Sequence, residues 1–157
     1  MTTPPIENDV VERKIRIAAR PETVFSFFTE PEKMMRWKGI NNTLDARPGG
    51  IFRVDTNGRD VMRGEFLEVV PYTRIVFTWG AEKGIIPLLP GASIVEVTFI
   101  PDGLDTIVHL RHYNLGNSQI RDAHMMGWDH YFERLITVAQ GGDPGSDPWV
   151  LTKTMGE

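Results

Sequence analysis

The sequence has no cysteine, no long apolar run and no excess of basic residues, and each absence excludes a class of protein. Without cysteine there is no disulfide framework, no thiolate zinc site and no cysteine nucleophile. No segment approaches the roughly 20 apolar residues that span a bilayer. The formal net charge of −4 disfavours nucleic acid and anionic membrane surfaces, because both require a basic face. We therefore expect no nucleic-acid partner and no membrane insertion.

Motifs for catalysis and cofactor binding are also missing. The chain contains no Gly-x-Ser-x-Gly sequence, no phosphate-cradling loop and no HExxH sequence. The sequence therefore predicts no cofactor and no metal site, and it gives no support for catalysis. The first nine residues are polar and lack the basic start and apolar run of a signal peptide, so we expect a cytoplasmic protein.

The length and composition are those of one globular domain. The chain has 157 residues, of which 41% are hydrophobic and 24% charged. We expect a flexible N-terminus over residues 1–9, one domain over residues 10–141 and a C-terminal tail over residues 142–157.

The hydrophobic pattern predicts one strand, two short helices, several more strands and one long helix. Alternation over residues 10–18 predicts an edge strand, in which Arg13 interrupts the apolar face. Pro21 and Pro31 are typical of the first turn of a helix. Alternation resumes over residues 51–55, 60–70, 74–79, 93–100 and 106–112. Within these strands, Asn57-Gly58 predicts a type I′ hairpin and Gly64 predicts a bulge.

The long helix is predicted over residues 118–140, with Ser118 as its N-cap. Its apolar residues recur at three and four positions, which indicates one buried face: Met125, Trp128, Phe132, Leu135 and Ala139. We expect Gly127 to let this helix approach a sheet closely. The predicted fold class is α+β of helix-grip type, in which a curved antiparallel sheet of about six to seven strands wraps the C-terminal helix.

An ordered set of short motifs covers residues 10–140. In chain order these motifs are ARPETVF at 19–25, PEKMMRW at 31–37, RPGG at 47–50, GEFLEVVP at 64–71, VFTW at 76–79, VEVTF at 95–99, LRH at 110–112 and GW at 127–128. The set resembles the activator of Hsp90 ATPase (Aha1-like) branch of the SRPBCC/START/Bet v 1-like superfamily. The resemblance implies a helix-grip fold with an internal cavity.

The function implied by this resemblance is broad, because superfamily members include lipid and hormone carriers, cyclases and an Hsp90 co-chaperone domain. A fold alone does not select among these functions. We expect binding of a small hydrophobic molecule in the cavity. The alternatives are a protein-interaction module resembling an Hsp90 co-chaperone domain, or a cyclase- or hydrolase-like enzyme that uses His112 as an acid or base.

Two histidines are the polar candidates for a ligand site. Alternation places His112 on the cavity side of its strand, where it either contacts a ligand or is satisfied by a backbone carbonyl. His124 shares a helix face with Trp128, but two imidazoles without a third ligand do not indicate a metal. His109 is expected to point away from the cavity and His130 to be exposed.

The remaining site predictions follow from the positions of the apolar side chains. Arg63 either carries surface charge or, if buried, anchors an anionic ligand head. The aliphatic residues between the strands ending at 79 and starting at 93 form either a lid, a fixed plug or a dimer contact. The tail residues Trp149, Val150 and Leu151 pack on the domain or on a partner subunit, which leaves a homodimer open. The predicted ligand-binding residues are Trp37, Phe52, Val54, Phe66, Phe77, Trp79, Val97, Phe99, Leu110, His112, His124 and Trp128, and the predicted lid residues are Ile85, Ile86, Leu88 and Leu89.

Overall fold

The computed structural model describes residues 9–151. Nearly all of the expected flexible N-terminus, and the tail beyond Leu151, therefore lie outside the described residues. In chain order the elements are β1 (Val11–Ile17), α1 (Pro21–Thr29), α2 (Pro31–Met34), β2 (Asn41–Leu44), β3 (Ile51–Asp55), β4 (Val61–Val70), β5 (Arg74–Lys83), β6 (Ser93–Asp102), β7 (Asp105–Tyr113) and α3 (Ser118–Ala139).

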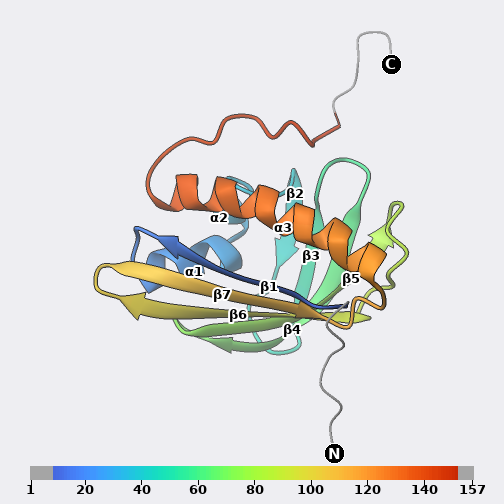
Figure 1. Ribbon diagram of the computed structural model, residues 1–157, viewed down its shortest axis with the longest axis horizontal. Coiled ribbons are helices and arrows are strands. Elements are labelled where there is room, and N and C mark those ends of the chain that lie inside the picture. The colour runs from blue at the N-terminus through green and yellow to red at the C-terminus, as the bar shows by residue number, and fades with distance from the viewer. Residues whose placement is uncertain (1–8, 152–157) are drawn as a thin grey trace, which may run out of the picture.

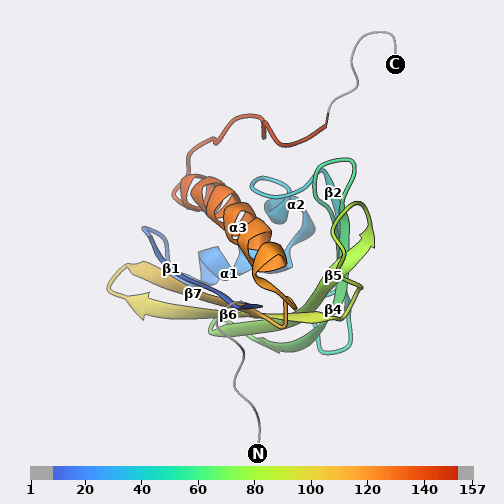
Figure 2. The same ribbon diagram turned by 45° about the vertical axis from the view of Figure 1, so that its right-hand side comes forward.

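The seven strands form one antiparallel sheet in the order β1-β7-β6-β5-β4-β3-β2. The sheet curves around α3, which crosses its concave face, and α1 lies between the sheet and the C-terminal half of that helix (Figures 1 and 2). This arrangement confirms the predicted helix-grip fold.

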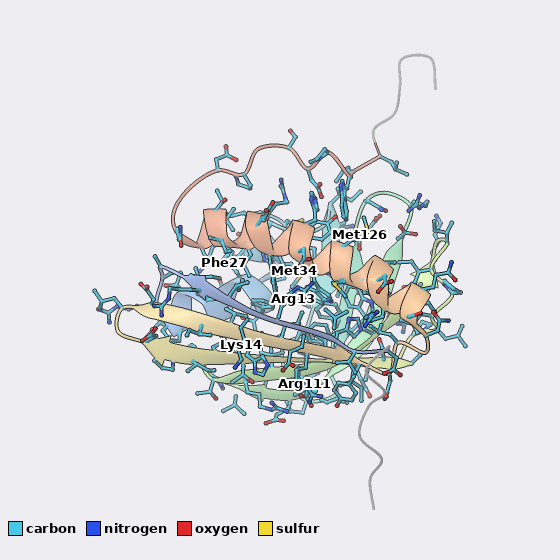
Figure 3. The ribbon with its side chains drawn as sticks, in the orientation of Figure 1. Arg13, Lys14, Phe27, Met34, Arg111 and Met126 are labelled. Carbon is cyan, nitrogen blue, oxygen red and sulfur yellow. The ribbon has the colours of Figure 1, made fainter. Side chains whose placement is uncertain are left out.

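Alternating side chains place the core between the sheet and α3. Val97 of β6 and Leu110 of β7 point inward and are fully buried, as is Leu135 on the facing side of α3. Lys14 and Arg111 lie on the outer face of the sheet, whereas Met126 projects from the far side of α3 (Figure 3). The period of two in the strands and the helical stripe therefore converge on a single core.

The charged residue Arg13, which interrupts the apolar face of β1, has a structural role. β1 is an edge strand, and Arg13 reaches across from it to Asp129 on α3, with a distance of 2.7 Å between Nε and Oδ1. The arginine that interrupts the apolar face of β1 thus pairs with the helix that covers the sheet.

Two predicted local features are wrong in detail. The N-cap of α3 is Asn117 rather than Ser118, because the Asn117 side chain accepts a hydrogen bond from the backbone N–H of Ile120. The β3–β4 hairpin exists, but its turn is not type I′: Gly58 has a φ of 91° while Asn57 is not in the left-handed region. Asn57 instead accepts backbone hydrogen bonds from Arg59 and Asp60, which builds a wider connection.

Gly64 does not mark a bulge. The register of β4 against β5 shifts between Val61 and Met62 and again between Phe66 and Glu68, on either side of the glycine. At Gly64 itself, an added Cβ would overlap the carbonyl oxygen of Thr78 on β5. The glycine therefore permits close approach of two backbones.

The opposite holds at Gly127, where we expected close approach. A Cβ at Gly127 would meet no atom within 4 Å. Gly127 therefore does not set the distance between α3 and the sheet.

These two glycines give a paired prediction. Gly64→Ala should lower the free energy of unfolding by about 1–3 kcal/mol, because the methyl group displaces backbone. Gly127→Ala should raise it by up to about 1 kcal/mol, because alanine favours a helix interior over glycine. Urea denaturation measures both changes, and equal effects of the two substitutions would contradict this assignment.

Candidate functional site

A pocket of about 270 Å³ opens between α3 and the connections at one end of the curved sheet. In Figure 2 this is the side on which β3, β4 and β5 rise beside the helix. Its walls come from α3, from the β3–β4 connection and from the residues after β5. The lining residues are Lys38, Thr56, Asn57, Arg59, Asp60, Met62, Trp79, Ile85, Ile86, Ala123, His124, Gly127, Trp128, Tyr131 and Trp149.

Lys38 places an ammonium group in the pocket. It follows the turn after α2, and its side chain is only 5% exposed. Its Nζ atom lies 4.3 Å from the ring centroid of Trp79 and 4.3 Å from that of Trp128, with Tyr131 at 5.4 Å. Among the described residues, no carboxylate forms an ion pair with this ammonium group. Burial lowers the pKa of Lys38 to about 7.

A hydrogen bond to a histidine holds the indole of Trp79. Trp79 Nε1 donates to His124 Nε2 at 3.1 Å. His124 Nδ1 lies 2.8 Å from the carbonyl oxygen of Ile120, and only a protonated Nδ1 can donate to that acceptor. His124 is therefore neutral, with its proton on Nδ1.

The second indole is held in the same way. Trp128 Nε1 donates to His112 Nδ1 at 3.0 Å, so the proton of neutral His112 is on Nε2, 2.8 Å from Ser93 Oγ. The Ser93 hydroxyl in turn donates to the carbonyl oxygen of Trp79. In this series of hydrogen bonds both ring nitrogens of His112 and the Ser93 hydroxyl have partners, which fixes the tautomer and the ring orientation of His112.

The pKa values of both histidines agree with these tautomers. Burial holds the pKa of His112 well below its usual value, and the nearby His124 and Lys38 add to the effect. Burial also lowers the pKa of His124, although its hydrogen bond to Ile120 opposes the shift. Both imidazoles are therefore neutral near pH 7 and present no charge to the pocket.

The residues that line the pocket include an ion pair between Arg59 and Asp60. Asp60 is buried and accepts hydrogen bonds from Arg59, Asn57 and the backbone N–H of Ile85. Burial alone would raise the pKa of Asp60, but these hydrogen bonds lower it. Asp60 is thus an ionised carboxylate whose charge is already compensated by Arg59.

The tail completes the pocket wall. Trp149 stacks on His130 with ring centroids 3.8 Å apart, and Leu151 N–H donates to the carbonyl oxygen of Asn57. The described tail therefore packs on its own domain, along α3 (Figure 1). His130, which we expected to be exposed, is instead covered by Trp149 and bonded to Asp147.

The predicted site residues divide into pocket and core. Trp79, His124 and Trp128 line the pocket, together with Ile85 and Ile86 of the predicted lid. Leu88 is buried in the core, whereas Leu89 is 77% exposed and does not line the pocket. The other predicted ligand-binding residues are packed in the core: Trp37, Phe52, Val54, Phe66, Phe77, Val97, Phe99, Leu110 and His112.

Other expectations about polar residues resolve as follows. His109 faces the outer surface of the sheet and bonds to Glu12, as expected. Arg63 is exposed on β4 and does not reach the pocket. Within residues 9–151, no group of three His, Asp or Glu side chains is arranged to hold a metal ion, and no helix is both long and apolar enough to cross a bilayer.

Sequence reasoning missed the residue that gives the pocket its charge. A lone lysine beside Trp37 carries no pattern, because most lysines are solvated. The sequence of residues 56–60 predicts only a turn, although four of its side chains or backbone positions line the pocket: Thr56, Asn57, Arg59 and Asp60. The sole usable signal was the Asn-Gly pair, which located the hairpin but not its side chains.

Comparisons with known proteins agree with this fold. The family model "Activator of Hsp90 ATPase homolog 1-like protein" matches residues 18–140. The chain belongs to this family. An AHSA1-like protein from Rhizobium etli is 38% identical over 92% of this chain and 90% of that protein, with a TM-score of 0.72. No functionally curated protein matches the chain.

More distant structures share the fold alone. An Hsp90 activator from Plasmodium falciparum is 21% identical over 83% of this chain and 95% of that chain, with a TM-score of 0.66. A protein from the dynemicin biosynthetic locus is 22% identical over 90% of this chain and 51% of that chain, with a TM-score of 0.77.

The buried lysine makes stability depend on pH. Between about pH 7 and pH 9 the unfolded chain keeps the Lys38 proton while the folded chain loses it, so stability rises with pH. The free energy of unfolding should increase by up to about 1.4 kcal/mol per pH unit. Lys38→Met should remove this increase, whereas Lys14→Met, on the outer face of the sheet, should retain it. Equal slopes in the two variants, measured by urea denaturation, would contradict the burial of Lys38.

Proposed function

We propose that this chain binds a small, largely apolar molecule in the pocket beside α3. The observation that carries the proposal is the pocket itself: two indoles form its floor, and Met62 and Ile86 lie along its walls. Preformed, mostly apolar cavities with a few placed polar groups are the usual form of small-molecule sites.

The environment of Gly127 supports a site kept open for a ligand. Gly127 lines the pocket from the middle of α3, and a side chain there would extend into open space. A Cβ added at this position would meet no atom within 4 Å. A glycine in a helix interior costs stability relative to alanine, so its presence agrees with a need for this volume.

The enzyme alternative finds no support in these residues. Both ring nitrogens of His112 are engaged by Trp128 and Ser93, and those of His124 by Trp79 and Ile120. Neither imidazole has a free nitrogen with which to exchange a proton with a substrate.

Interaction with an Hsp90-type chaperone is the second candidate, and the family match favours it. The two functions make different demands on the pocket. A variant with a filled pocket should lose ligand binding, but it should keep a chaperone contact made through the outer surface. Co-purification of the filled variant with the chaperone, measured beside the wild type, separates the two.

Filling the pocket should abolish binding. Gly127→Leu places a side chain in the space beside the indoles, so it should weaken binding of the neutral fluorescent probe N-phenylnaphthylamine at least about tenfold. Met126→Leu, on the exposed side of the same helix, is the matched control and should bind like the wild type. Undiminished binding by a folded Gly127→Leu protein would place the probe elsewhere and refute the proposed function.

The two isoleucines after β5 are proposed to act as a lid. Ile85 and Ile86 line the pocket, although Ile85 is 71% exposed. Ile86→Ser should change the association and dissociation rates of the probe in stopped-flow fluorescence. Leu89 is 77% exposed and lies outside the pocket, so Leu89→Ser should change neither rate. If both substitutions leave the rates unchanged, the segment is a fixed wall rather than a lid.

A further inference from the structure

We infer that the pocket is selective for ligands with a singly charged anionic head, such as a carboxylate on an apolar body, and that Lys38 is the residue that pairs with this head. The inference rests on the proposed function and adds the chemical class of the ligand. It assigns to Lys38 the anchoring role that the sequence suggested for Arg63, which the structure places on the surface.

The first observation is the position of the ammonium group. Lys38 is only 5% exposed, yet it lines the pocket. Its Nζ atom contacts the faces of Trp79 and Trp128, which attract a cation but accept no proton and carry no net charge. The group that would normally accompany a buried ammonium is a carboxylate, and the described residues supply none.

None of the described titratable groups around Lys38 supplies a negative charge that pairs with its ammonium group. His112 on β7 and His124 on α3 are neutral, and each has both ring nitrogens engaged. Tyr131 on α3 presents its ring to Lys38, and burial raises the pKa of its hydroxyl, which stays protonated. Asp60, in the β3–β4 connection, is held by Arg59. The cation is thus left for a group that enters the pocket.

A single negative charge fits this environment best. The ammonium is already stripped of most of its water, so a carboxylate that pairs with it bears chiefly its own desolvation cost. The aromatic floor and the side chains of Met62 and Ile86 would contact the apolar body of the same molecule. A doubly charged phosphate would keep one charge uncompensated in an apolar site, which is unfavourable.

Proton linkage makes the inference measurable. A bound carboxylate favours the charged form of Lys38, so binding takes up a proton whenever the free protein has lost one. Affinity for the acid should therefore fall as pH rises above about 7, by about tenfold per pH unit. A neutral ligand with the same apolar body does not favour the charged form, and its affinity should not fall in this range.

The experiment compares naphthaleneacetic acid with naphthaleneacetamide, which differ in charge but share one apolar body. Each displaces N-phenylnaphthylamine from the protein between about pH 6.5 and pH 9. We expect the wild type to prefer the acid at least about tenfold at the lowest pH. The preference should shrink as pH rises, and Lys38→Met should lose it while still binding the amide.

The outcomes separate the two proposals. If the neutral probe does not bind the wild type, the proposed function fails and the inference fails with it. If the probe and the amide bind but the acid is not preferred, ligand binding stands and the anionic selectivity is refuted. A preference for the acid that persists in Lys38→Met would also refute the role of Lys38. The pH dependence in the wild type provides a test that needs no variant to fold.

Discussion

The contact between the Lys38 ammonium and the faces of Trp79 and Trp128 is the interaction on which the pocket depends. A buried ammonium without a counter-charge is unfavourable, and contacts with aromatic faces contribute only about 2 kcal/mol each when desolvated. The indoles therefore offset part of the cost, and burial still lowers the pKa of Lys38 to about 7. Near neutral pH the Lys38 amine can therefore take up a proton, and its charged form can pair with an anion.

The indoles can play this part because other residues fix them. Trp79 on β5 bonds to His124 on α3, and Trp128 on α3 bonds to His112 on β7. These two bonds tie α3 to β5 and to β7, the two strands that flank β6. The two histidines are best understood as supports for the tryptophans. Their neutral state also matters, because a charged imidazole beside Lys38 would repel its ammonium group.

The sequence predicted the fold well because its strongest signals are periodic. The apolar stripe around Trp128 and the alternation through Val97 and Leu110 each lead to one buried face, and the motifs placed the elements in a known order. Local chemistry was less predictable. The type of turn at Asn57 and the role of Gly64 depend on how the strands meet, which a single strand does not encode.

The site was predicted only in part, for a physical reason. A packed core and a lined cavity have the same composition. Phe77 and Trp79 are both large aromatic residues on one face of the same predicted strand, yet Phe77 is packed in the core and Trp79 lines the pocket. Lys38 is buried because the turn after α2 brings it against the rings of Trp79, Trp128 and Tyr131. Trp149 joins the pocket wall because the tail returns along α3 and stacks on His130. Both placements come from tertiary structure.

The central claim is that Lys38 is a buried amine that titrates near neutral pH, and nuclear magnetic resonance of isotope-labelled lysine side chains tests it most directly. The account predicts one lysine resonance with a midpoint near pH 7, absent from Lys38→Met and shifted to higher pH when naphthaleneacetic acid is added. If every lysine resonance in the folded protein titrates above about pH 9, the ammonium is solvated and the account is wrong.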